Sequence, residues 1–354
     1  MTKTRMEITA APGRVVRPGH QITCCVRVVT DRPIQVNHGV VRLEGEARSV
    51  PFDVYRLAAN SGNMVVSLYE RHAVVQRYGY QPFAFRHRAA DNPSPLILQG
   101  GSSWDGMVIT IPSPAPDTWR GNRGHNGSVK YRVVAELRYN SLDVNQRPVG
   151  MEKRLLEEVE VVVRNVADVR DFCLDENAAD RTEKLVRGMW GSSGLVKCEL
   201  FLPLRTFVLG DAIPADVHIV NRSPRAIRHA SLALFQEMTF TDSISPSRPG
   251  SVSYTVTDEL HELSLLRVEP GGSFHRTVAG LMAPAYGLTS GSFRGSSCIS
   301  VRFFVQLKVK WFFGSLKSSV NIILGSTRSS EKNGTPSTGE GKFPDLGCRS
   351  EAEV

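Results

Sequence analysis

One group of side chains in this sequence has a spacing that suggests a binding site, and it consists of positive charges. Lys130, Arg132 and Arg138 share one parity in a run that alternates polar and apolar residues, so in a β-strand they would lie on one face. The opposite face would be core, formed by Val129, Tyr131, Val133, Ala135 and Leu137. Together with Arg14 and Arg17, the three charges predict a surface that binds acidic or phosphorylated segments of a partner protein. The alternative interpretation is a solvated outer face without a ligand.

A second basic run, residues 222–228 (RSPRAIR), also has two interpretations. It could bind an anion, or it could be a polar loop between strands, and the sequence leaves both open. No catalytic pattern accompanies either run, because the chain has no GxSxG, GxGxxG, HExxH or P-loop lysine motif, its nine histidines are dispersed and its six cysteines include no CxxC pair. The sequence therefore predicts a protein that is not an enzyme and that uses no metal or other cofactor.

Composition and charge narrow the class of protein. Hydrophobic residues make up 41% and charged residues 22% of the 354 residues, as in a globular protein with room for about two domains. The net charge of +8 favours anionic partners: phosphopeptides, lipid headgroups or nucleic acid. The first residues lack the apolar stretch of a signal peptide, and no run approaches the length of a transmembrane helix. We therefore expect a cytoplasmic protein.

Alternation with a period of two is the dominant pattern along the chain. It is cleanest at residues 299–313 and 129–139, and similar runs occupy 155–166, 195–204, 212–220 and 228–240. Clusters of Gly, Pro, Asn and Asp separate these runs, and no rhythm of strands and helices accompanies them. Many short, half-buried strands bounded by turns predict an all-β fold built from β-sandwiches.

The two halves of the chain resemble each other. When the two halves are aligned with an offset of 191 residues, Gly19 matches Gly210 and Ile22 matches Ile213. With an offset of 170 residues, a later block at 129–133 matches residues 299–303. Two matched blocks in one order predict two β-sandwich domains of one design in tandem. Small and polar residues dominate the last segment, and we expect a disordered tail there.

Short motifs follow one another in a fixed order along both halves. In the first half they are residues 16–22 (VRPGHQI), 40–47 (VVRLEGEA), 111–112 (IP) and 127–137 (GSVKYRVVAEL). In the second half they are residues 194–196 (GLV), 209–215 (LGDAIPA), 220–223 (VNRS) and 298–305 (CISVRFFV). Their order and spacing, over about residues 6–325, resemble those of the arrestin-domain-containing (α-arrestin-like) protein family.

This resemblance implies a domain plan and a function. The plan is two arrestin-type, immunoglobulin-like β-sandwiches at residues 6–168 and 194–325, a hinge or connector at 169–193 and the disordered tail at 326–354. The implied function is a cytoplasmic adaptor, peripheral to the plasma membrane or endosomes, that links cytoplasmic segments of membrane-protein cargo to sorting or ubiquitin-ligase factors. No nucleic acid partner is expected. The alternative function is a module that binds an anionic lipid surface without a dedicated protein cargo.

The sequence departs from the family pattern at places that concern its partners. Its tail has no Pro-Pro-x-Tyr motif, which α-arrestins use to recruit ubiquitin ligases with WW domains. The Lys-Lys phosphate sensor and the clathrin-binding motifs of visual and β-arrestins are also absent. Where the family has a turn similar to Pro-Thr-Ser-Phe, this chain has residues 116–119 (PDTW). The sequence therefore leaves open which cargo is bound and whether a ubiquitin ligase is recruited at all.

Overall fold

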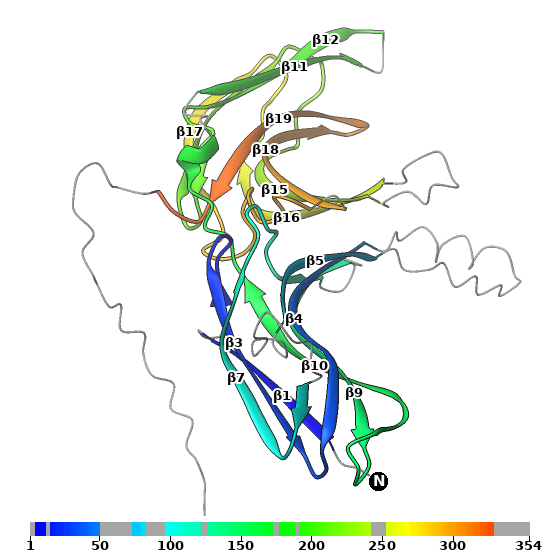
Figure 1. Cartoon of the computed structure of the whole chain (residues 1–354). Coiled ribbons are helices and arrows are strands. Elements are labelled where there is room, and N and C mark those ends of the chain that lie inside the picture. The colour runs from blue at the N-terminus through cyan, green and yellow to red at the C-terminus, as the bar shows by residue number, and fades with distance from the viewer. Residues whose placement is uncertain are drawn as a thin grey trace, which may run out of the picture.

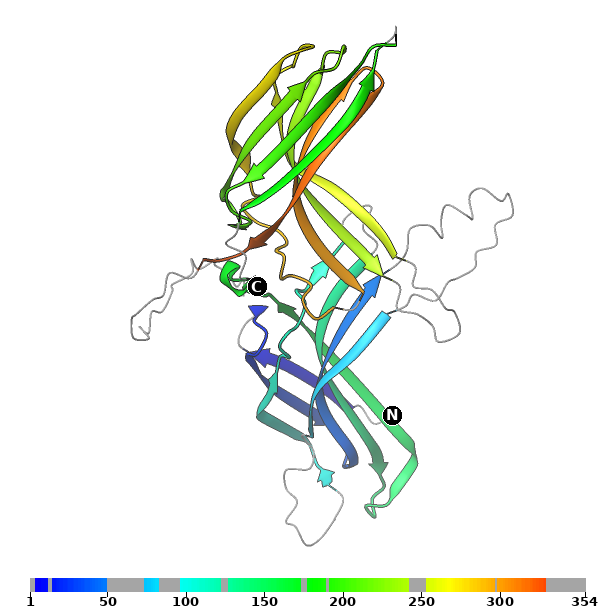
Figure 2. The ribbon, with the colours of Figure 1, turned by 90° about the horizontal axis from the view of Figure 1, so that it is seen from above.

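The described part of the chain folds almost entirely into β-strands, which confirms the predicted fold class (Figure 1). A computed structural model describes residues 4–11, 15–49, 73–82, 96–121, 127–172, 177–188, 191–241, 253–296 and 298–328. Within these residues the one helical element is a short 3₁₀ turn, η1 (Val169–Phe172). The strands form two sandwiches that lie end to end along the molecule (Figure 2).

The first sandwich contains a small and a large sheet. The small sheet has the order β1–β3–β7, with β1 (Thr4–Ala11), β3 (Gln21–Thr30) and β7 (Gly101–Thr110). The large sheet has the order β2–β10–β9–β4–β5, and in addition β6 pairs with β4 and β8 pairs with β9. Its strands are β2 (Val15–Val16), β4 (Ile34–Ser49), β5 (Ala73–Pro82), β6 (Leu96–Leu98), β8 (Trp119–Arg120), β9 (Gly127–Leu142) and β10 (Pro148–Val163).

The second sandwich has one sheet of four strands and one of five. The first has the order β11–β12–β14–β17, with β11 (Ala178–Arg187), β12 (Ser193–Leu202), β14 (Ala212–Asn221) and β17 (Ser273–Met282). The second has the order β13–β19–β18–β15–β16, with β13 (Thr206–Val208), β15 (His229–Thr241), β16 (Ser253–Leu265), β18 (Ile299–Trp311) and β19 (Gly314–Gly325).

Strand order explains the repeat in the sequence. The matched blocks fall on β3 and β14 and on β9 and β18, which hold equivalent positions in their sheets. In both domains, a very short strand runs parallel to the last strand of the larger sheet: β2 beside β10 and β13 beside β19. Each pair of sheets encloses its own core, because alternate residues of the central strands are apolar and point inward. In β3 and β14, every second residue is buried over most of the strand.

The segment expected to be the connector contains a strand of the second domain. Residues 178–187 form β11, the edge strand of the four-stranded sheet, and β12 begins at Ser193. The alternation in β11 was not visible in the sequence, since its exposed positions are mainly charged and Val186 is its one fully buried residue. The chain crosses between the sandwiches over residues 164–177, between the end of β10 and the start of β11.

The end of the second domain returns to this crossing. The Ser326 N–H donates to the Ala167 carbonyl (2.8 Å), and Asp168 forms a parallel bridge with Thr327. Ser326 and Thr327, the first two residues of the predicted tail, therefore contact this crossing, whereas Arg328 contacts Thr206 and Asp211 of the second domain. The rest of that prediction, residues 329–354, lies outside the described residues.

Candidate functional site

The predicted basic strand is β9, and its two faces point as the alternation indicated. Val129, Tyr131, Val133, Ala135 and Leu137 are all buried in the first core. On the other face, the Lys130 and Arg138 side chains are exposed and Arg132 is partly buried. The structure thus confirms which face of β9 meets the core.

The two arginines of this face are paired with carboxylates, Arg132 with those of neighbouring strands and Arg138 with one on β9 itself. Arg132 lies 3.4 Å from Glu44 on β4 and 3.0 Å from Glu158 on β10. Arg138 lies 2.9 Å from Glu136 on its own strand. In the described part of the chain Lys130 makes no ion pair. Two of the three predicted charges therefore already have anionic partners within the protein.

Below them lies a buried ion cluster centred on Arg42 and Glu136. Arg42 is 9% exposed and contacts Glu44 at 2.8 Å and Glu136 at 2.9 Å. Arg154 on β10 adds a third contact to Glu136, at 3.0 Å. Burial by itself would raise the pKa of Glu136, but hydrogen bonds from Arg154, Arg138 and Arg42 outweigh burial and lower that pKa to about 2.

The remaining residues of the predicted site lie elsewhere or outside the described chain. Arg17 is exposed and follows β2, which lies beyond β10 and hence two strands away from β9. Arg14 is not among the described residues. The buried ion cluster around Arg42 and Glu136 was not found from the sequence, because its members on β4, β9 and β10 are brought together only by strand order and register. The sequence shows the period of a strand but not its neighbours.

A second group of functional interest lies where the two domains meet. Trp119 of the first domain packs against Phe240 (6.1 Å between ring centroids) and edge-on against Phe293 (5.5 Å) of the second. Phe240 in turn stacks on Tyr254 at 4.8 Å. Although Phe240 and Phe293 come from the second domain, they belong to the hydrophobic core of the first. The domains therefore share a continuous aromatic contact.

Asp117 lies at the same junction and joins three segments. Its carboxylate accepts hydrogen bonds from the Asn165 backbone N–H, in the crossing, and from the Ser292 side chain, in the second domain. Its own N–H donates to the Ser292 carbonyl at 2.6 Å. Asp117 is 5% exposed, and this burial raises the pKa of its carboxyl despite the hydrogen bonds and the nearby Arg164.

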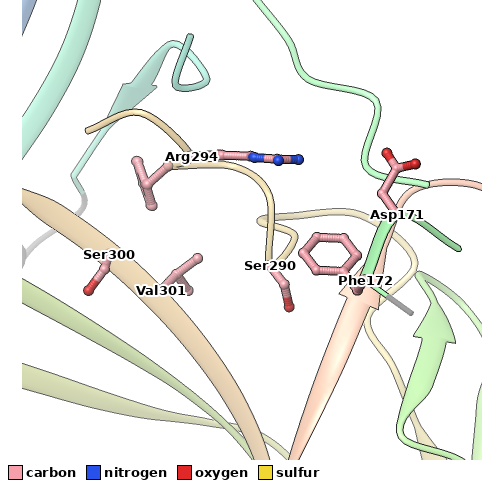
Figure 3. A pocket seen from close by; sticks show the side chains of 7 residues that line it. Asp171, Phe172, Ser290, Arg294, Ser300 and Val301 are labelled. Carbon is pink, nitrogen blue, oxygen red and sulfur yellow. The ribbon is translucent and has the colours of Figure 1, made fainter. Parts of the chain in front are cut away.

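A cavity of about 420 Å³ opens beside this junction (Figure 3). It is lined by residues of η1, of the loop before β18 and of β18 itself, namely Asp171, Phe172, Ser290, Phe293, Arg294, Ser300 and Val301. The lining combines two aromatic rings with the guanidinium of Arg294 and the carboxylate of Asp171 (Figure 3). These residues are suited to holding a small polar or aromatic group, and no base stands beside a nucleophile among them.

The fold and this junction define a class of protein: two β-sandwiches of one design, joined through a shared aromatic and hydrogen-bonded contact. Residues 192–329 match the family model for the C-terminal domain of arrestin (or S-antigen). The match runs from the start of β12 to just past the end of β19. The second sandwich is thus similar to an arrestin C-terminal domain, and proteins of the arrestin family act in general as adaptors.

No curated protein sequence matches the chain. In the part of the chain that the structure describes, no group of three or more His, Cys, Asp or Glu side chains could hold a metal ion. Among the same residues, no helix is long and apolar enough to cross a membrane.

Proposed function

We propose that this protein is a non-enzymatic adaptor that links cytoplasmic segments of membrane-protein cargo to endocytic sorting or ubiquitination factors. The observation that carries this proposal is the arrestin C-terminal domain at residues 192–329, which forms the second of two sandwiches with matching strand order. An adaptor of this kind would act at the cytoplasmic side of the plasma membrane or of endosomes.

For the cargo site, we propose the outer face of the large sheet in the first domain. Its exposed cations include Lys130, Arg138 and Arg154, with Arg132 half-covered between Lys130 and Arg138 and Arg17 near the sheet edge. Because Arg132 and Arg138 already contact glutamates, an acidic cargo segment would have to compete for them. Each exposed pair is worth only ~0.2–1 kcal/mol, so binding would need several contacts and would weaken with salt.

The test is affinity capture of the full chain from membrane-containing lysates, with mass spectrometry of the bound proteins. Membrane proteins together with sorting or ubiquitination factors are the expected result. A set of bound proteins without either class, or enzymatic turnover of a substrate by the purified chain, would contradict the adaptor.

The cargo site is tested separately with Lys130→Gln, Arg132→Gln and Arg138→Gln combined. Glutamine removes the charges without placing new carboxylates beside Glu44 and Glu136, as charge reversal would. The matched control is Arg5→Gln with Arg27→Gln, which removes charge from β1 and β3 of the same domain. Loss of cargo in the first variant and not in the control supports the site; equal capture by all three proteins would disprove it.

A further inference from the structure

The cavity beside the domain junction carries one positive and one negative side chain that are not paired with each other. Arg294 and Asp171 both line the cavity, and both are exposed. In the part of the chain that the structure describes, neither side chain makes an ion pair. The Arg294 guanidinium points toward the side of the cavity from which Asp171 projects (Figure 3). A ligand in this cavity would therefore meet a cation and an anion at once.

The loop that carries Arg294 is held in place from two sides. On one side, the Ser290 N–H donates to the Leu324 carbonyl (2.8 Å) and the Ser290 hydroxyl accepts from the Leu324 N–H (3.0 Å). On the other side, the Ser292 carbonyl accepts from the Asp117 N–H of the first domain (2.6 Å). The guanidinium is thus displayed from an ordered loop, so that binding of a ligand would cost little ordering of the protein backbone.

The facing wall comes from η1 and is partly apolar. The Asp171 N–H donates to the Asp168 carbonyl at 3.1 Å, which fixes the turn that carries its carboxylate. Phe172 follows directly, and its ring is partly buried. The partly buried Val301 of β18 and the edge of the buried Phe293 complete the apolar part of the lining. The cavity therefore combines two opposite charges with one apolar wall.

The two charges decide the class of ligand. A simple anion would be attracted by Arg294 and repelled by Asp171, and a simple cation would meet the reverse. A molecule with one carboxylate and one ammonium group satisfies both side chains, and an aromatic body suits the apolar wall. The volume of about 420 Å³ lies within the usual range for small-molecule pockets, roughly 300–1,000 Å³. The backbone inside a polypeptide carries neither terminal group, so a small free molecule fits better than a peptide segment.

We propose that this junction cavity binds a small aromatic zwitterion of the free amino acid type. The carboxylate of the ligand accepts hydrogen bonds from the Arg294 guanidinium, its ammonium group donates to the Asp171 carboxylate, and its ring packs beside Phe172. The site lies on the connector and the second domain, away from the outer face of β9. It therefore goes beyond the proposed adaptor function and does not rest on it.

The experiment is titration of the full chain with L-tryptophan, followed by calorimetry and by ligand-observed NMR. Two analogues serve as matched ligands: tryptamine lacks the carboxylate, and indolepropionate lacks the ammonium group. Because the cavity is open and the contacts are few, tryptophan is expected to bind with a dissociation constant of roughly 0.1–1 mM. Each analogue loses one charged contact and faces one repulsive charge, so each should bind at least about threefold more weakly.

Two substitutions separate the two charges of the cavity. Arg294→Gln should weaken tryptophan binding at least about threefold and leave tryptamine binding unchanged or stronger. Asp171→Asn should also weaken tryptophan binding, but it should strengthen the binding of indolepropionate. The matched control is Arg276→Gln with Asp31→Asn, which removes one charge of each sign at exposed positions outside the cavity and should leave all three ligands unaffected. Circular dichroism checks that every variant keeps its β-structure.

The possible outcomes decide between this ligand and others. Failure of tryptophan to bind, unchanged tryptophan binding by Arg294→Gln, or equal loss in the control variant would overturn the proposal. If indolepropionate or inorganic phosphate binds wild type more tightly than tryptophan does, the cavity is an anion site and the proposal of a zwitterion is wrong. Tryptophan binding that depends on both charges supports the site even where no membrane-protein cargo is captured, and that combination contradicts only the adaptor function.

Discussion

Replacing Glu136 by glutamine should destabilise the first domain strongly, although the two side chains have nearly the same shape. Glu136 is 4% exposed and contacts Arg42, Arg138 and Arg154. Each unit of pKa corresponds to about 1.4 kcal/mol, so lowering its pKa from 4.5 to about 2 corresponds to roughly 3 kcal/mol of stability at neutral pH. Leaving a buried cation without its partner costs a similar ~3–5 kcal/mol, and here Arg42 keeps Glu44. We therefore expect a loss of about 2–3 kcal/mol.

The same reasoning fixes how this loss depends on pH. A carboxyl whose pKa is depressed in the folded state stabilises the protein above its unfolded pKa, and that contribution disappears as the pH falls toward the folded pKa. The difference between wild type and Glu136→Gln should be complete at pH 7 and should shrink to about 1–1.5 kcal/mol at pH 3. Urea unfolding followed by circular dichroism at both pH values measures it.

Glu158→Gln provides the matched control. Glu158 is about half exposed (48%) and contacts only the surface side of the cluster, through Arg132. Its replacement should cost less than about 1 kcal/mol. The reasoning would be refuted if Glu136→Gln unfolded at the same urea concentration as wild type, or if its deficit were the same at pH 3 as at pH 7.

Three further substitutions test the junction and the packing around it. Asp117→Asn keeps an oxygen acceptor but removes a buried charge; because burial raises the pKa of Asp117, the charged form costs stability at pH 7. The variant should be at least as stable as wild type there, with an advantage that declines as the pH falls, and lower stability in urea at pH 7 would contradict this. Phe240→Ala should cost about 3–5 kcal/mol and separate the two domains into distinct calorimetric transitions, whereas one unshifted transition would argue against a shared core. Gly127→Ala places a Cβ 2.7 Å from the Phe240 ring and 3.1 Å from the Arg48 carbonyl, so it should lower the melting temperature, and an unchanged temperature would contradict the close contact.

The sequence predicted the fold well because the fold depends on local periodicity. The alternation in β9 and β18, the turn clusters and the repeat were sufficient to place strands, faces and two domains of one design. Periodicity did not reveal β11, because that strand lacks a continuous apolar face and its exposed positions are mainly charged.

The candidate sites were less predictable, because they depend on which strands become neighbours. Nothing local in the sequence relates Arg42 to Glu136, although register places their strands side by side. Nor does it show that the loop carrying Arg225 folds over Phe313. A row of charges in one strand can be identified from its spacing, but whether those charges are free depends on the carboxylates of the adjacent strands.

The chain enters and leaves the second domain at the same place, where the two segments are hydrogen-bonded to each other. It enters the domain past Ala167 and Asp168, and it leaves past Ser326 and Thr327, which are hydrogen-bonded to those same residues. Tension applied to the segment beyond residue 328 would therefore load the junction between the domains first and would bypass the distant end of the second sandwich.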